Sequence, residues 1–111
     1  MLLNPSVTEA FGNVTLEALA CAVAVVAAAA SGASSLIRDD VNGILVDPNY
    51  VEGFADALEA YGRDADLRRR HGEAGVAFAA TMNWDRINGA VIRAYERAII
   101  KRERLTRITG R

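Results

Sequence analysis

Two glutamates flank a glycine just before a predicted helix, and this group is the part of the sequence best suited to chemistry. Glu9 precedes Gly12, and Glu17 follows it by five residues. The first N–H groups of a helix lack partners within the helix and attract phosphate, and glycine lets the backbone approach a ligand closely. The backbone at Phe11, Gly12 and Asn13 is therefore predicted to cradle a phosphate, while each carboxylate accepts hydrogen bonds from sugar hydroxyls.

A simpler interpretation of the two glutamates stays open at this point. Acidic side chains near the start of a helix also stabilise it by interacting with the helix dipole. Asn13 is the expected N-cap residue, and Glu17 lies one turn later on the same side of the helix. Spacing alone does not separate a sugar-binding pair from two acids that stabilise the helix.

The elements that must position this group alternate between strands and helices. Short strands are expected over residues 2–3, 23–27 and 43–46. Helices are expected over residues 13–22 and about 84–104, and apolar residues recur at helical spacing over 51–61 and 67–78. A loop is expected over residues 28–35, with one helical turn at 36–37 after it. Alternation of this kind predicts an α/β fold with a parallel sheet, in which ligands bind at the carboxyl ends of the strands. Three visible strands are few, so the chain is expected to be the last part of a larger α/β domain.

Composition and charge exclude several classes of function. One Cys and one His cannot form a zinc site, and no basic block interleaved with aromatic residues indicates a nucleic-acid surface. Neither a membrane span nor a signal peptide is expected, so the expected location is the cytoplasm. Residues 1–62 carry a net charge of −7 and residues 63–111 a net charge of +6. The basic half predicts either a solvated helical surface or a contact with an acidic partner or an anionic membrane.

The glutamate segment resembles a motif of one enzyme family. The residues Pro5-Ser6, Glu9, Phe11-Gly12, Glu17-Ala18, Ala20-Cys21 and Val25-Val26 match its spacing, and Leu36 to Asp39, Val41 to Val46 and Pro48 resemble its next block. This pattern is similar to the Glu-x7-Glu motif of retaining, nucleotide-sugar-dependent glycosyltransferases of the GT-B fold, most like glycosyltransferase family 4 (group 1). The resemblance extends from Leu2 to about Ile99.

The resemblance implies a role for each residue of the motif. Glu9 is expected to be the catalytic residue that contacts hydroxyls of the donor sugar, and Glu17 to bind the ribose hydroxyls. Phe11, Gly12 and Asn13 would approach the sugar and the diphosphate, and Leu16 would line the nucleotide site. Glycosyl transfer in this family retains the anomeric configuration and needs no metal or further cofactor, because a nucleotide-diphosphate sugar is the donor substrate.

The chain also departs from the family pattern. Ala22 and Ala24 replace the usual Gly and Pro after the first helix, and Ser34-Ser35 replace Pro-Glu. The expected fold is a partial Rossmann-like α/β domain with short parallel strands and a helical C-terminal half, the C-terminal portion of a GT-B fold. Residues 1–83 would be the donor-nucleotide-binding part, and residues 84–111 the C-terminal crossover helix and basic tail.

The missing N-terminal domain would bind the acceptor, which is a sugar, a lipid or a small molecule. The chain alone is therefore expected to be an inactive glycosyltransferase fragment, of hexosyltransferase type by resemblance. The alternative is a non-catalytic nucleotide-binding or protein-interaction module, and a peripheral membrane contact is a further expected partner. Four other features are interpreted structurally: His71 as a packed or half-exposed structural histidine, Cys21 as a buried small residue, Arg68 to Arg70 as a solvated helix face, and Trp84 as a hydrophobic anchor.

Overall fold

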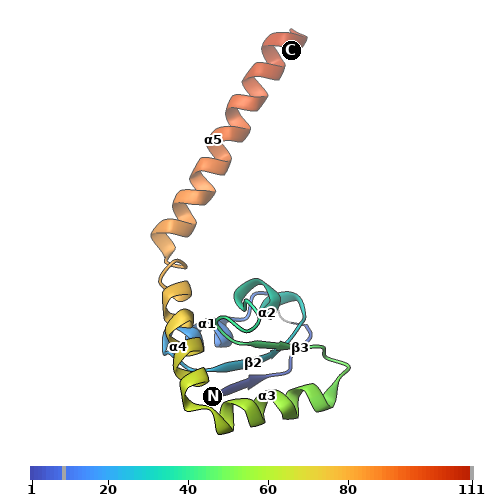
Figure 1. The fold of residues 1–111 in the computed structure, drawn as a ribbon. Coiled ribbons are helices and arrows are strands. Elements are labelled where there is room, and N and C mark those ends of the chain that lie inside the picture. Colours follow the sequence, from blue (N-terminus) through green and yellow to red (C-terminus); the bar gives the residue numbers. More distant parts are fainter. Residues whose placement is uncertain (9, 111) are drawn as a thin grey trace. The chain divides into compact units, whose positions relative to one another are not determined.

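The computed structural model describes residues 1–8 and 10–110, and the chain divides into two compact units, Met1–Ala80 and Thr81–Arg111. The N-terminal unit holds a parallel three-stranded sheet in the order β1-β2-β3 (Figure 1). Its strands are β1 (Leu2–Asn4), β2 (Val25–Ala28) and β3 (Ile44–Val46). The predicted α/β class with short parallel strands and a helical C-terminal half is confirmed.

Helices cover both faces of this sheet. The helices of the unit are α1 (Asn13–Ala20), α2 (Ser31–Leu36), α3 (Val51–Arg63) and α4 (Ala65–Ala79). Figure 1 shows α3 along one face of the strands, with α1 and α2 across the other. Every residue of β2 is buried, as expected for a central strand that is covered on both sides.

The side-chain alternation of the strands divides the core into two layers. Val26 and Val46 face α3 and form a cluster with Ala57 and Tyr61. Val25 points to the opposite face by the two-residue period of a strand, and it is fully buried. Small side chains on β2 let the helices approach closely, so this alanine-rich segment is still fully buried.

One helix was not expected. Residues 28–35 were predicted to be a loop with a single turn after it, but α2 spans Ser31–Leu36. Serine and glycine are weak helix formers, so the local sequence gives little signal. Packing decides the outcome, because Ala33 and Leu36 are both only 2% exposed.

The end of α1 requires a left-handed residue. Ala22 has φ 58°, and the N–H of Val23 donates to the carbonyl of Ala18 at 2.9 Å while the N–H of Ala22 donates to that of Leu19 at 3.1 Å. These two bonds make a Schellman motif, in which glycine is the favoured left-handed residue. Alanine is therefore costly at position 22, where the family pattern has glycine. The helix α1 ends at Ala20, two residues before the predicted end at residue 22.

A buried polar pair lies between α3 and α4. The hydroxyl of Tyr61 lies 2.7 Å from Nδ1 of His71 and 3.3 Å from the carbonyl oxygen of Val25, at the start of β2. Burial raises the pKa of Tyr61, and the negative charges of Asp40 and Asp39 raise it further. His71 is 1% exposed, which confirms its interpretation as a packed structural histidine.

The C-terminal unit consists mainly of α5 (Trp84–Thr109). The side chain of Asn83 accepts from the N–H of Arg86 at 2.8 Å and caps the start, and Gly110 ends the helix with φ 70°. The helix runs five residues beyond the predicted end near Arg104. None of its residues is buried, and no helix among the described residues is long and apolar enough to span a membrane.

Candidate functional site

The loop that carries the glutamate motif lies where the sheet fold predicts a ligand site. Because the three strands are parallel, they end at one edge, and the connections over residues 5–12, 29–30 and 47–50 all leave from it. Ligands of open α/β sheets bind at this edge. The longest of the three connections leads from β1 into the first turn of α1, so this loop and this turn form the candidate site.

The start of α1 differs in one detail from the prediction. Gly12 is the N-cap residue and Asn13 is already the first helical residue, so the prediction of Asn13 as the N-cap is wrong. The physical reason is the backbone of Gly12, which adopts φ 90° and ψ 52°, a left-handed conformation that asparagine adopts less readily. Gly12 is buried and its carbonyl accepts the first intrahelical bond from Leu16 at 3.1 Å.

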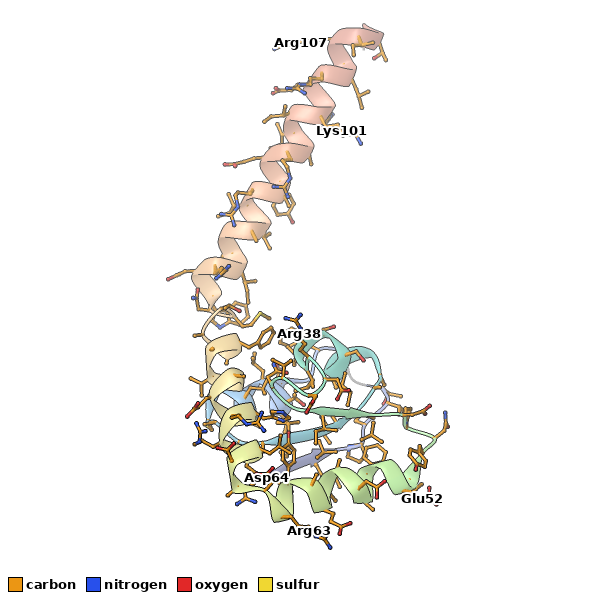
Figure 2. The ribbon with its side chains drawn as sticks, in the orientation of Figure 1. Arg38, Glu52, Arg63, Asp64, Lys101 and Arg107 are labelled. Atoms are coloured by element: carbon orange, nitrogen blue, oxygen red, sulfur yellow. The ribbon has the colours of Figure 1, made fainter. Side chains whose placement is uncertain are left out.

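Among the described residues, the first N–H groups of α1 donate to no capping side chain, because the N-cap residue Gly12 has none. By contrast, Asp64 caps α4 by accepting from the N–H of Leu67 at 3.0 Å (Figure 2). An uncapped helix start that follows a left-handed glycine exposes backbone donors and the positive end of the helix dipole to a ligand. This arrangement can bind an anion at the carboxyl edge of the sheet.

The predicted site side chains that the structure describes lie on α1 or just before it. Phe11 is 40% exposed, Glu17 is exposed and Leu16 is half-buried. In the part of the chain that the structure describes, the carboxylate of Glu17 has no hydrogen-bond or ion-pair partner. Asn13 and Glu17 are four residues apart and both exposed, so they share one face of the helix. Glu9 lies outside the described residues, and its predicted role stays a prediction.

The basic residues of the N-terminal unit all follow this segment in the sequence. Residues 1–37 contain no lysine or arginine, and the first base is Arg38, in the connection between α2 and β3 (Figure 2). On α4, Arg69 pairs with Asp66 at 2.7 Å and with Glu73 at 3.0 Å, and Arg70 pairs with Asp66 at 3.1 Å. Arg69 and Arg70 are more than half exposed, as predicted for a solvated face. The same prediction is wrong for Arg68, which is half-buried and donates to the carbonyl of Tyr61. Within residues 1–37, an anion could be bound by backbone N–H groups but by no basic side chain.

The prediction that Cys21 is buried is wrong, because its side chain is exposed. Cys21 is the C-cap of α1, one residue before the left-handed turn at Ala22, and the helix turns this position outward. Trp84 was interpreted as a hydrophobic anchor, and at 77% exposure it has no covering partner among the described residues.

Sequence reasoning missed two residues behind the site. Asn4, at the end of β1, donates from Nδ2 to Oγ1 of Thr15 at 3.0 Å, and its Oδ1 accepts from the N–H of Ser6 at 3.2 Å. Thr15 is fully buried. Buried polar side chains are unusual, but the burial of these two is visible only in the structure.

Comparisons with known proteins agree on one family. A family model described as "Glycosyl transferases group 1" matches residues 1–78. The chain is 42% identical over 94 residues to a protein of Kribbella flavida named D-inositol 3-phosphate glycosyltransferase, with 85% of this chain and 22% of that protein covered. It is 43% identical over 96 residues to the protein of the same name in Mycobacterium avium, covering 86% of this chain and 23% of that protein.

Solved structures support the same assignment. Sucrose-phosphate synthase from Thermosynechococcus elongatus aligns with a TM-score of 0.77 and 29% identity, over 89% of this chain and 25% of that chain. The Anabaena protein HepE, solved in complex with UDP, aligns with a TM-score of 0.77 and 28% identity, over 85% of this chain and 26% of that chain. The chain thus spans about a quarter of the length of each of these relatives.

Proposed function

Because this chain belongs to the glycosyl transferases group 1 family, we propose that it forms the donor-nucleotide half-site of a retaining GT-B glycosyltransferase, with a nucleotide-diphosphate sugar as donor. The observation that carries the proposal is the family motif placed on an uncapped helix start at the carboxyl edge of a parallel sheet. That HepE was solved with UDP supports a nucleoside diphosphate as the ligand class. The assignment to family 4 and to hexosyl transfer is part of this proposal.

The roles within the site follow from the chemistry of each group. The backbone N–H groups at residues 11–13 bind the diphosphate, and Gly12 allows its close approach. Leu16 lines the nucleotide site. Glu17, which has no partner among the described residues, accepts hydrogen bonds from the two ribose hydroxyls. Glu9 contacts the donor sugar as the catalytic residue. No metal or further cofactor takes part in the proposed reaction.

The chain by itself is proposed to bind the donor without transferring it. Stabilising a diphosphate leaving group is a large electrostatic contribution to such a reaction, and residues 1–37 supply no cationic side chain for it. The acceptor (a sugar, a lipid or a small molecule) would bind to a separate domain of the longer protein. Transfer therefore requires residues beyond these 111, and we place the reaction in the cytoplasm.

Calorimetric titration of UDP, GDP and ADP, and of their sugar conjugates, into the chain tests donor binding. We expect one of the three nucleotides to bind, and Glu17→Gln to weaken it by about tenfold, because a hydrogen bond to a charged group contributes roughly 1.5–3 kcal/mol. The matched control is Glu52→Gln, which removes an exposed acid from the first turn of α3 (Figure 2). If the two variants bind equally well, Glu17 only stabilises its helix.

Catalysis needs a second experiment on a longer protein. In a version that carries an acceptor domain, Glu9→Ala and Glu17→Ala are expected to abolish sugar transfer. Wild-type rates in both variants would disprove the enzymatic assignment. A folded chain that binds none of the nucleotides would instead favour the alternative of a protein-interaction module.

The exposed apolar side of α5 also enters the proposal. Trp84, Tyr95 and Ile99 are 77%, 68% and 57% exposed, and they lie on one side of the helix by its 3.6-residue period. We propose that this side packs against the acceptor domain of the longer protein, as a crossover helix. Seven bases and three acids on α5 make an anionic membrane the competing partner. Salt-sensitive sedimentation of the chain with phosphatidylserine vesicles, absent with neutral vesicles, would favour the membrane.

A further inference from the structure

Asn4 connects the two ends of the candidate donor loop. It is the last residue of β1, and the loop over residues 5–12 separates it from the first turn of α1. Its Oδ1 accepts from the N–H of Ser6 at 3.2 Å, inside the loop, and its Nδ2 donates to Oγ1 of Thr15 at 3.0 Å, in the helix. One side chain thus holds both the loop entry and the helix start.

Both partners of the second bond are withdrawn from water. Asn4 is 9% exposed and Thr15 is 0% exposed. Thr15 and Leu19 are one turn apart on the buried side of α1, opposite to the accessible side that carries Glu17. Polar groups buried in this way are costly unless they are paired, so the bond strongly favours a single arrangement of loop and helix.

We propose that Asn4 and Thr15 form a positioning pair that fixes the loop of residues 5–12 for binding of the nucleoside diphosphate. The proposal rests on the proposed donor-binding function of the loop. Neither side chain contacts the donor, because both lie behind the loop and the helix. They act through the left-handed turn at Gly12, whose φ of 90° orients the N–H groups that bind the diphosphate.

The physical basis is preorganisation. Backbone donors stabilise an anion only if they already point at it, and a loop that must order itself on binding loses affinity for that reason. Breaking hydrogen bonds of ordinary strength changes a local equilibrium by roughly tenfold. Removing the pair should therefore lower affinity for the nucleotide by about tenfold, although no contact with the ligand is lost.

The experiment compares Asn4→Leu and Thr15→Val with a matched buried asparagine. Asn42 is 3% exposed, accepts from the N–H of Arg38 at 2.7 Å and donates to the carbonyl of Leu36 at 3.0 Å. It stabilises the connection before β3, which is the outer strand on the other side of β2 from β1. Asn42→Leu therefore removes two equivalent hydrogen bonds from a buried site away from the candidate donor loop.

Nucleotide affinity is measured by calorimetry, and amide hydrogen exchange by NMR, on the 111-residue chain. Asn4→Leu and Thr15→Val should each weaken nucleotide binding by about tenfold, and the double variant should bind no more weakly than Asn4→Leu. Asn42→Leu should bind normally once its unfolded fraction is subtracted. Amides of residues 6–8 and 10–12 should exchange faster in the first two variants only.

Two results would overturn the positioning role. One is unchanged affinity in Thr15→Val, which keeps the shape of the side chain and decides the question if Asn4→Leu does not fold. The other is an equal loss of affinity in Asn42→Leu, which would mean that general destabilisation weakens binding. If the unmodified chain binds no nucleotide, the proposed function fails, and amide exchange alone still supports the positioning pair or contradicts it.

Discussion

Ala22→Gly is expected to stabilise the chain, although glycine usually weakens a helix. An L-residue other than glycine pays about 1–2 kcal/mol for a left-handed conformation, and Ala22 has φ 58°. Glycine in turn lowers the free energy of unfolding by roughly 0.4–1 kcal/mol, because it gives the unfolded chain more conformational freedom. The methyl group of Ala22 lies on an exposed residue, so its removal opens no cavity. The difference is a gain of about 0.5–1 kcal/mol in the free energy of unfolding.

Thermal and urea unfolding followed by circular dichroism measures this gain. For a unit of 80 residues, a gain of this size raises Tm by roughly 2–8 °C. The control is Ala20→Gly, the same substitution two residues earlier at an exposed position that is still helical, where about 0.5–1 kcal/mol should be lost. If Ala22→Gly lowers Tm as Ala20→Gly does, the left-handed strain does not exist in solution and the Schellman assignment is wrong.

Three further substitutions test other parts of the structure. Gly12→Ala forces a side chain into φ 90° and should weaken nucleotide binding in calorimetry while it costs about 1–2 kcal/mol in unfolding. Gly72→Ala would place Cβ 2.5 Å from the carbonyl oxygen of Ala22 and should lower stability by about 1–3 kcal/mol in urea unfolding. Burial raises the pKa of Tyr61 in the folded chain, so the neutral hydroxyl is favoured by folding. The stability that the neutral Tyr61 contributes is fully present below about pH 10 and is lost as the pH rises beyond that value. Tyr61→Phe should therefore be less stable at neutral pH, without the hydrogen bond to His71, but should lose less stability than the unmodified chain under alkaline conditions.

The order of elements could be predicted because the sequence marks it locally. The valines of β2 and the apolar stripes of α3, α4 and α5 specify a buried strand and amphipathic helices directly. The helix α2 could not be predicted in this way, because its serines and glycine carry no helical preference. Burial of Ala33 and Leu36 stabilises it instead.

The candidate site was only partly predictable for a similar reason. The loop and helix start could be located from residue types, since glycine and carboxylates have distinct chemistry. The cap assignment failed because the left-handed conformation of Gly12 depends on the path of the whole loop. The pairing of Asn4 with Thr15 joins residues eleven positions apart, and no periodic pattern in the sequence predicts it.

The position of β1 has a consequence for the behaviour of the chain in solution. In the described part of the chain β1 pairs only with β2, so its other side presents N–H and C=O groups at the edge of the sheet. Leu3 is 43% exposed at this edge. An edge of this kind can add a strand from another molecule. Self-association at high concentration, and not unfolding, would then limit how concentrated a solution of the chain can be kept.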